Sequence, residues 1–305
     1  MCTVVLHAST ASGASGRDLR VGSRMAHTGR LRNRRQQPAA KAIQNLIRGA
    51  WPLLACLALL AGGCRSHRDN VLRVGVTPGP AEEVLRSVET DLARQGLRLD
   101  VVAFSDYVQP NMALASHDID ANLYQNVVFL NQYNHDHQTH FVSLCKVYLP
   151  LMAIYPGRAK SLASLSNGAR VAIPNDPVNH DRALLLLEKA GLLELAHQPD
   201  ALTARIFANP KRIELVELDA AQLPRSLDDV DAAAINANFA LDAGLNPSNG
   251  ALFTETLDSP YANVLSVNAE AQADPRFRAL AAALTSTQAR AFITGHYGGA
   301  IYPAQ

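Results

Sequence analysis

The sequence predicts an α/β fold of two lobes, and three observations carry this prediction. From residue 71 onward, short apolar runs typical of strands alternate with segments of helical pattern. Two strand-like runs, 71–76 and 170–174, are each followed by a turn and a helix, like the opening unit of a sheet. The chain has 305 residues, of which 48% are hydrophobic and 18% charged, so it can bury a core and is too apolar to be disordered.

The predicted elements follow from apolar runs and from the residues that bound them. Pro, Asn, Asp and Gly mark the turns, and Gly191 follows a Leu-rich helix that it would end. We expect mostly parallel sheets, with strands at 71–76, 97–104, 119–123, 170–174, 213–218, 232–235 and 262–267, and a strand-rich segment at 141–155. Helices are expected at 80–95, 109–116, 124–135, 161–165, 181–190, 221–227, 238–243, 275–283 and 288–297.

The N-terminal segment differs in charge from the rest of the chain. Residues 1–63 hold nine of the 28 Lys and Arg but only one of the 27 Asp and Glu, which gives this segment +8 and the rest −7. A basic head on an acidic body is typical of a targeting segment and argues against nucleic acid as a partner. We predict that residues 1–63 are a signal peptide with an N-terminal extension.

A lipid-anchoring site is predicted directly after this segment. The apolar run 50–61 is too short to span a bilayer and matches the core of a signal peptide. The small residues before Cys64 resemble the lipobox of bacterial lipoproteins, which predicts lipidation of Cys64, a tether over 64–70 and a place in the bacterial cell envelope, facing the periplasm. The alternative is a plain secretory signal with an incidental cysteine. Only Cys145 remains in the body, so no disulfide framework is expected.

Arg182 is the first candidate for ligand recognition. It lies at the predicted start of the helix that follows strand 170–174, where a helix terminus and a guanidinium would both favour an anion such as a carboxylate. The alternative is a surface ion pair with Asp181 or Glu188.

Amides and aromatic rings supply the other candidates. Asn236 and Asn238 follow the strand 232–235, and Asn263 enters the strand 262–267; their amides could bind an ammonium or a carboxylate, or simply cap helices and turns. Tyr107, Tyr124 and Phe129 could wall an apolar pocket or pack in a core.

A different class of function would use histidines. His135, His137 and His140 could bind a metal in a metal-binding protein or metal-dependent enzyme, although a solvated surface cluster is the better explanation. The sequence contains no G-x-S-x-G, P-loop or G-x-G-x-x-G motif. We therefore expect a binding protein without a cofactor rather than an enzyme.

Seven motifs resemble one known family. They are VGVTPGP (74–80), FSDYVQPN (104–111), DIDAN (118–122), IPNDPVN (173–179), RALLLLEKAGL (182–192), LPRSLDDV (223–230) and SPYAN (259–263). The chain thus resembles the NlpA lipoprotein family, which includes MetQ-type methionine-binding lipoproteins, from about residue 72 to 305. The resemblance implies a two-lobed periplasmic-binding-protein fold with a ligand cleft between the lobes. It also implies a monomer that delivers an amino acid, most simply L- or D-methionine, to an ABC permease in the inner membrane.

The resemblance assigns roles to single residues. It implies that Arg182 binds the ligand carboxylate, that Asn238 and Asn263 hold its backbone groups, and that Tyr107 lines the pocket. The family's Phe-Gln-His-x-x-Tyr corresponds to 124–129 here, where Asn126 replaces the histidine. This departure leaves open another amino acid or a methionine derivative as the ligand. Lobe one is expected to comprise 71–152 and 262–305, and lobe two 153–261.

Overall fold

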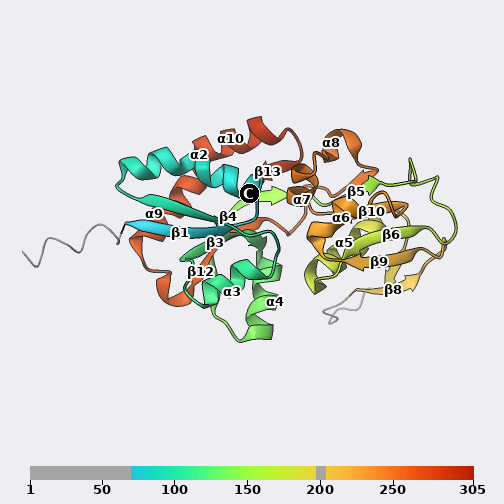
Figure 1. The fold of residues 1–305 in the computed structure, drawn as a ribbon, viewed down its shortest axis with the longest axis horizontal. Helices are drawn as coiled ribbons and strands as arrows, with labels where there is room; N and C mark the ends of the chain where they lie inside the picture. Colours follow the sequence, from blue (N-terminus) through green and yellow to red (C-terminus); the bar gives the residue numbers. More distant parts are fainter. Residues whose placement is uncertain (1–69, 197–203) are drawn as a thin grey trace, which may run out of the picture. The chain divides into compact units, whose positions relative to one another are not determined.

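Two mixed β-sheets, each with its own helices, and a small two-stranded sheet make up the described part of the chain (Figure 1). The computed structural model describes residues 70–196 and 204–305. The predicted signal peptide, Cys64 and all but the last residue of the tether lie outside these residues. Within the described ranges, no helix combines the length and the apolar character that a membrane span requires.

The first sheet has six strands in the order β13-β4-β12-β3-β1-β2. β1 is parallel to β2 and β3, whereas β12 is antiparallel to β3 and β4, and β13 is antiparallel to β4. The strands are β1 (Val71–Val76), β2 (Arg98–Ala103), β3 (Ala121–Asn126), β4 (Phe141–Pro150), β12 (Asn263–Asn268) and β13 (Ile301–Pro303).

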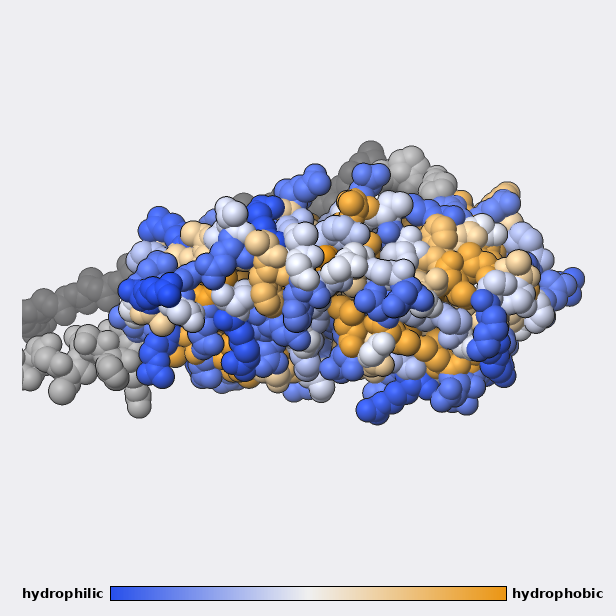
Figure 2. Space-filling view, turned by 90° about the horizontal axis from the view of Figure 1, so that it is seen from above, coloured by the Kyte–Doolittle hydropathy of each residue, from blue (hydrophilic) through white to orange (hydrophobic). Residues whose placement is uncertain are grey.

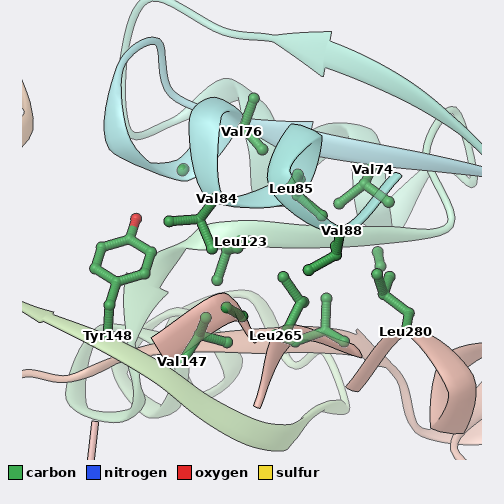
Figure 3. Close-up of a cluster of buried hydrophobic side chains, with 14 of the residues drawn as sticks. Val74, Val76, Val84, Leu85, Val88, Leu123, Val147, Tyr148, Leu265 and Leu280 are labelled. Carbon is green, nitrogen blue, oxygen red and sulfur yellow. The ribbon is translucent and has the colours of Figure 1, made fainter. Parts of the chain in front are cut away.

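Helices pack on this sheet through apolar stripes. In α2, Val84, Leu85 and Val88 face the core, while Glu82 and Arg86 form an ion pair on the outside. Figure 3 shows these three side chains packed with residues of the sheet and of α9. The helices of this lobe are α2 (Pro80–Arg94), α3 (Gln109–Ala115), α4 (Val127–His137), α9 (Pro275–Leu284) and α10 (Thr287–Tyr297), with the 3₁₀ turn η2 (Ala269–Ala271).

The second sheet has five strands in the order β11-β5-β10-β6-β9. β6 is parallel to β9 and β10, and β5 is antiparallel to β10 and β11. The strands are β5 (Ala153–Pro156), β6 (Arg170–Pro174), β9 (Glu214–Leu218), β10 (Ala232–Ile235) and β11 (Phe253–Thr254). The other elements are α5 (Pro177–Lys189), η1 (Ala220–Gln222), α6 (Leu223–Ser226), α7 (Ala237–Asp242), α8 (Pro247–Gly250) and the hairpin β7 (Glu194–Ala196) with β8 (Arg205–Ala208).

The chain passes between the two sheets twice. It leaves the first sheet after β4, returns after β11, and re-enters the first sheet as β12. This membership supports lobe boundaries at 71–152 with 262–305 and at 153–261, which stay predictions.

Four expectations about local structure were wrong. The sheets are mixed rather than mostly parallel, because β4, β5, β11, β12 and β13 run antiparallel to neighbours. Residues 124–126 belong to the fully buried strand β3, and the helix starts only after Asn126, whose side chain caps it. Residues 161–165 form turns held by reciprocal Ser161–Ser164 hydrogen bonds rather than a helix. The helix of Arg182 begins at Pro177 rather than Asp181, because Asp176 is its N-cap and proline suits its first position.

Apolar side chains also reach the surface. On the face seen in Figure 2, hydrophilic residues surround patches of apolar ones, which gather mainly over the second sheet and its helices. Phe207 in β8 is 77% exposed, and Val108 at the N-cap of α3 and Met112 within this helix are more than half exposed. Exposed apolar side chains are common on protein surfaces, because polar residues cannot cover the whole surface.

Candidate functional site

One cavity brings all eight predicted ligand-binding residues together. These side chains surround about 330 Å³ of space between atoms, part of which is open to solvent. Strands, helices and loops of both lobes line it: Tyr107, Tyr124, Gln125, Asn126, Phe129, Pro150 and Asn263 from the first, and Asn179, Arg182, Asn236, Ala237 and Asn238 from the second. That these side chains bind a ligand stays a prediction.

Strand ends explain why these residues meet. Asn126 ends β3, and Asn236 and Asn238 follow the last residue of β10. In α/β sheets, ligands bind beyond the carboxyl ends of the strands, where loops and helix starts present polar groups. The Asn236 side chain makes no capping hydrogen bond to α7, although Asn236 is the N-cap residue. The capping alternative therefore does not account for its side chain.

Arg182 is buried against a carboxylate that the sequence analysis did not identify. Its side chain is 3% exposed and that of Glu255 is 8% exposed. Nε donates to Glu255 Oε1 at 2.8 Å, and Nη2 donates to Glu255 Oε2 at 2.6 Å and to the Pro150 carbonyl at 2.7 Å. The Tyr261 ring lies 4.5 Å from the guanidinium carbon. Arg182 thus lies in the second turn of α5, not at the helix terminus, and its ion pair is with neither Asp181 nor Glu188.

This bidentate pair fixes the charge and orientation of the guanidinium. Burial acts to lower the pKa of Arg182, but the neighbouring Glu255 carboxylate outweighs it, so the pKa lies above its ordinary value. Glu255 also accepts a hydrogen bond from the Met152 N–H at 2.9 Å, so its carboxylate joins the two chain crossovers. Nη1 takes no part in these bonds and is the guanidinium nitrogen that remains for a ligand.

Two of the amides that line the cavity carry a buried polar atom without a partner in the described part of the chain. Asn238 Oδ1 accepts from the Tyr107 hydroxyl at 2.5 Å, and Asn236 Nδ2 donates to Asn179 Oδ1 at 2.8 Å. The opposite atoms, Asn238 Nδ2 and Asn236 Oδ1, are buried and have no hydrogen-bond partner in the described part of the chain. Leaving a buried donor or acceptor unpaired costs about 1–3 kcal/mol. A ligand with one acceptor and one donor group would satisfy both.

Two further amides have one free end each. Asn263 Nδ2 donates to the Tyr124 carbonyl at 2.9 Å and to the Tyr148 hydroxyl at 3.1 Å, which leaves its Oδ1 as an acceptor for a ligand. Asn126 Oδ1 accepts from the Phe129 N–H at 3.0 Å as the cap of α4, which leaves its Nδ2 as a donor. Asn126 stands where the family pattern has a histidine. Because a carboxamide does not titrate, Asn126 contributes no charge to the cavity.

Aromatic rings form the apolar wall. Tyr107, Tyr124 and Phe129 lie with ring centroids 5.9–6.2 Å apart, and Phe239 of α7 lies 4.9 Å from Tyr107. The Tyr124 hydroxyl donates to the Tyr107 carbonyl at 3.2 Å. Burial raises the pKa of both tyrosines, so their hydroxyls stay neutral donors. The packing of Phe239 on Tyr107 is a contact that the sequence analysis missed.

A buried amide network lies beside the cavity. Gln125 Nε2 donates to Asn111 Oδ1 at 2.7 Å, Asn122 Oδ1 at 3.0 Å and Ser266 Oγ at 3.2 Å. Asn111 Nδ2 donates back to Gln125 Oε1 at 2.9 Å, and Ser266 Oγ donates to Asn122 Oδ1 at 2.7 Å. The network joins α3, β3 and β12 and holds Gln125, which also lines the cavity.

The histidine cluster lies elsewhere. His135 and His137 end α4, and both are exposed, as is His140. His137 packs on the Tyr133 ring at 4.1 Å, and His135 lies 3.0 Å from the Asp136 carboxylate. Over residues 70–196 and 204–305, no group of three His, Cys, Asp or Glu side chains could hold a metal ion.

Comparisons with known proteins agree on one family. The family model described as NlpA lipoprotein matches residues 72–305. The D-methionine-binding lipoprotein MetQ of Salmonella typhi is 42% identical over 219 residues, which are 70% of this chain and 80% of that protein.

Solved structures of such proteins share the fold. A nutrient binding protein from Burkholderia cenocepacia bound to methionine is 39% identical, with a TM-score of 0.74 over 77% of this chain and 100% of that one. A periplasmic substrate-binding protein of an ABC transporter from Coxiella burnetii is 42% identical, with a TM-score of 0.72 over 76% and 100%. The predicted two-lobed α/β fold of periplasmic binding proteins is confirmed, and the chain belongs to the NlpA lipoprotein family.

Proposed function

We propose that this protein is a substrate-binding lipoprotein that captures methionine, as the L or D isomer, and delivers it to an ABC importer. One observation carries the proposal: a bare amide acceptor, a bare amide donor and a buried guanidinium line the same small cavity. The names of the relatives support it, since one is a D-methionine-binding lipoprotein and one was solved with methionine bound.

An amino-acid zwitterion matches the polar atoms of the site. Its carboxylate accepts from Arg182 Nη1 and Asn238 Nδ2, and its ammonium donates to Asn236 Oδ1 and Asn263 Oδ1. Both charges leave water on binding, so each needs partners that replace its hydration. The thioether of methionine then packs against Tyr107 and the neighbouring rings, a contact that favours sulfur.

The charge balance selects against ligands with a net charge. Glu255 neutralises Arg182, so this pair adds no net charge to the cavity. A ligand with a second carboxylate or a second ammonium would bring a buried charge without a partner, which is strongly unfavourable. Asn126 adds a neutral donor and no charge. A different neutral amino acid or a methionine derivative is the competing ligand.

The N-terminal segment would hold the protein in the cell envelope. Lipidation of Cys64 would anchor the protein to a membrane surface, and the tether 64–70 would hold the two lobes beside an inner-membrane permease. Acyl chains on one cysteine give stable anchoring when there are two or more. The protein acts as a monomer, binds no cofactor and catalyses no reaction.

A ligand screen tests the function. Purified protein is unfolded and refolded to remove co-purified ligand, and L-methionine, D-methionine and the other amino acids are compared by thermal shift and calorimetry. A ligand that binds only the native state raises the melting temperature. Methionine should give the largest shift. A screen in which no amino acid binds would contradict the proposal, and a larger shift with another amino acid would change the assigned ligand.

A further inference from the structure

We propose that Asp176 and Asn179 are positioning residues that set the polarity of the Asn236 amide, so that its carbonyl oxygen faces the ligand's ammonium. The inference deepens the proposed function and rests on it. Asn179 lines the cavity, but Asp176 does not. Asp176 can therefore act on the ligand only through other residues, and we assign Asn179 the role of passing its effect to Asn236.

The three side chains form a chain of hydrogen bonds that leads away from the cavity. Asn236 Nδ2 donates to Asn179 Oδ1 at 2.8 Å. Asn179 Nδ2 in turn donates to both carboxylate oxygens of Asp176, at 3.0 and 3.1 Å. Asn179 and Asn236 are only 3% and 6% exposed. In such surroundings a mismatched donor or acceptor is costly, so the bonds depend on one another.

The Asp176 carboxylate fixes the donor-to-acceptor direction of all the hydrogen bonds in this series. A carboxamide has a donor end and an acceptor end of nearly equal shape, whereas an ionised carboxylate only accepts. Asn179 must therefore turn its NH₂ group to Asp176 and its oxygen to Asn236. Asn236 must then turn its NH₂ group to Asn179, which leaves Oδ1 as the atom that is buried and unpaired. Reversing either amide would bring two acceptors or two donors together.

Helix α5 holds Asp176, the first residue of this series of hydrogen bonds, in place. Asp176 Oδ1 also accepts from the Asn179 N–H at 2.9 Å as the N-cap of α5. A helix N-terminus favours a negative side chain. Burial raises the pKa of Asp176 above its ordinary value, and these hydrogen bonds from Asn179 limit that rise by favouring the carboxylate. Asn179 is thus bonded to Asp176 through both its backbone and its side chain.

Replacing Asp176 by asparagine reverses the pattern while keeping the cap. In Asp176→Asn the new Oδ1 can still accept from the Asn179 N–H, and an NH₂ group takes the place of Oδ2. Only Oδ1 then remains to accept from both the backbone N–H and the side-chain NH₂ group of Asn179. The new NH₂ group faces that side-chain NH₂ group, which favours rotation of Asn179 and then of Asn236. The cavity would gain a donor where the ammonium needs an acceptor.

The test compares two ligands that differ only in the ammonium group. L-methionine and 4-(methylthio)butanoate, which carries hydrogen in its place, are titrated by calorimetry into wild type and Asp176→Asn. We expect the ratio of their affinities to fall by about tenfold or more in the variant, the size expected for a lost hydrogen bond to a charged group. The matched control is Asp274→Asn, because Asp274 is the N-cap of α9 and does not line the cavity. This control should leave the ratio unchanged.

A structural role would give a different result. If Asp176→Asn weakened both ligands equally, or changed neither, the positioning role would be overturned. Should this variant fail to fold, Asn179→Ala breaks the same chain and should lower the same ratio. The wild-type titration tests the proposed function separately. If wild type prefers another amino acid, that amino acid and its deaminated form replace the pair; if it binds none, both proposals are overturned.

Discussion

The buried pair of Arg182 and Glu255 predicts a large and non-additive loss of stability on mutation. With both side chains less than a tenth exposed, removing one partner leaves the other charge buried and unpaired, which costs about 3–5 kcal/mol. For a domain of roughly 150–250 residues each kcal/mol lowers Tm by about 2–4 °C. Arg182→Met and Glu255→Gln, taken singly, should therefore each lower Tm by about 6–20 °C.

A double variant separates the free energy that the ion pair contributes to stability from the free energy that side-chain packing contributes. In Arg182→Met with Glu255→Gln, no charge is left unpaired, and the new amide oxygen can still accept from the Met152 N–H. Its loss of stability should fall short of the sum of the single losses by at least about 2 kcal/mol. Urea unfolding of the ligand-free protein measures the three free energies of unfolding. Single losses that add to within about 0.5 kcal/mol would refute the reasoning.

A solvent-exposed ion pair supplies the control for the stability measurements. Calorimetry adds a measurement of methionine affinity. Arg158 and Asp231 pair at 3.1 Å with side chains 55% and 22% exposed, so Arg158→Met should cost less than about 1 kcal/mol. Arg182→Met should also weaken methionine binding by about 2–5 kcal/mol, because the ligand carboxylate loses a buried charged partner. Unchanged affinity would show that the guanidinium serves only the fold.

Four other predictions concern separate parts of the molecule. Asn238→Asp places a carboxylate where the ligand's own carboxylate is expected, and calorimetry should show methionine affinity at least about tenfold weaker, whereas equal affinity would contradict the assignment. Gln125→Leu removes the centre of the amide network and should cost about 1–3 kcal/mol in urea unfolding, because several buried polar groups lose partners. Burial raises the pKa of Cys145 to about 11, so iodoacetamide at pH 8 should modify its peptide much more slowly in native than in unfolded protein, as followed by mass spectrometry. The Arg170 backbone N–H lowers the pKa of Asp231 below 3.8. The stability that the Asp231 carboxylate provides is therefore complete above pH 3.8 and is lost as the pH falls through the lowered, native pKa. On acid titration, Asp231→Asn should lose less of its free energy of unfolding than wild type does.

Residues near strand ends could be identified as site candidates from the sequence, because local signals place them. A buried strand followed at once by two asparagines predicts polar groups at a sheet edge, and Asn236 and Asn238 do line the cavity. The Asp176-Pro177 pair also carries an N-cap and first-turn signal for α5, which the sequence analysis overlooked when it began the helix four residues late.

Contacts between distant segments could not be predicted in the same way. Glu255 pairs with Arg182 across 73 positions of sequence, from an irregular segment with no periodicity. The strand β13 has three residues and is too short to give a pattern. Its place beside β4 is set by pairing with a strand about 150 positions earlier in the chain, which no local propensity encodes.

The order of strands in the first sheet has a consequence for how the chain folds during synthesis. β12 lies between β4 and β3, and β13 forms one edge, so the sheet needs segments from both ends of the body. The second sheet uses only residues 153–254, a single stretch. During synthesis this stretch is available as a unit, whereas β3 and β4 must wait for a strand made more than a hundred residues later. The lobe that is begun first is therefore the one that can be completed only when the last residues are present.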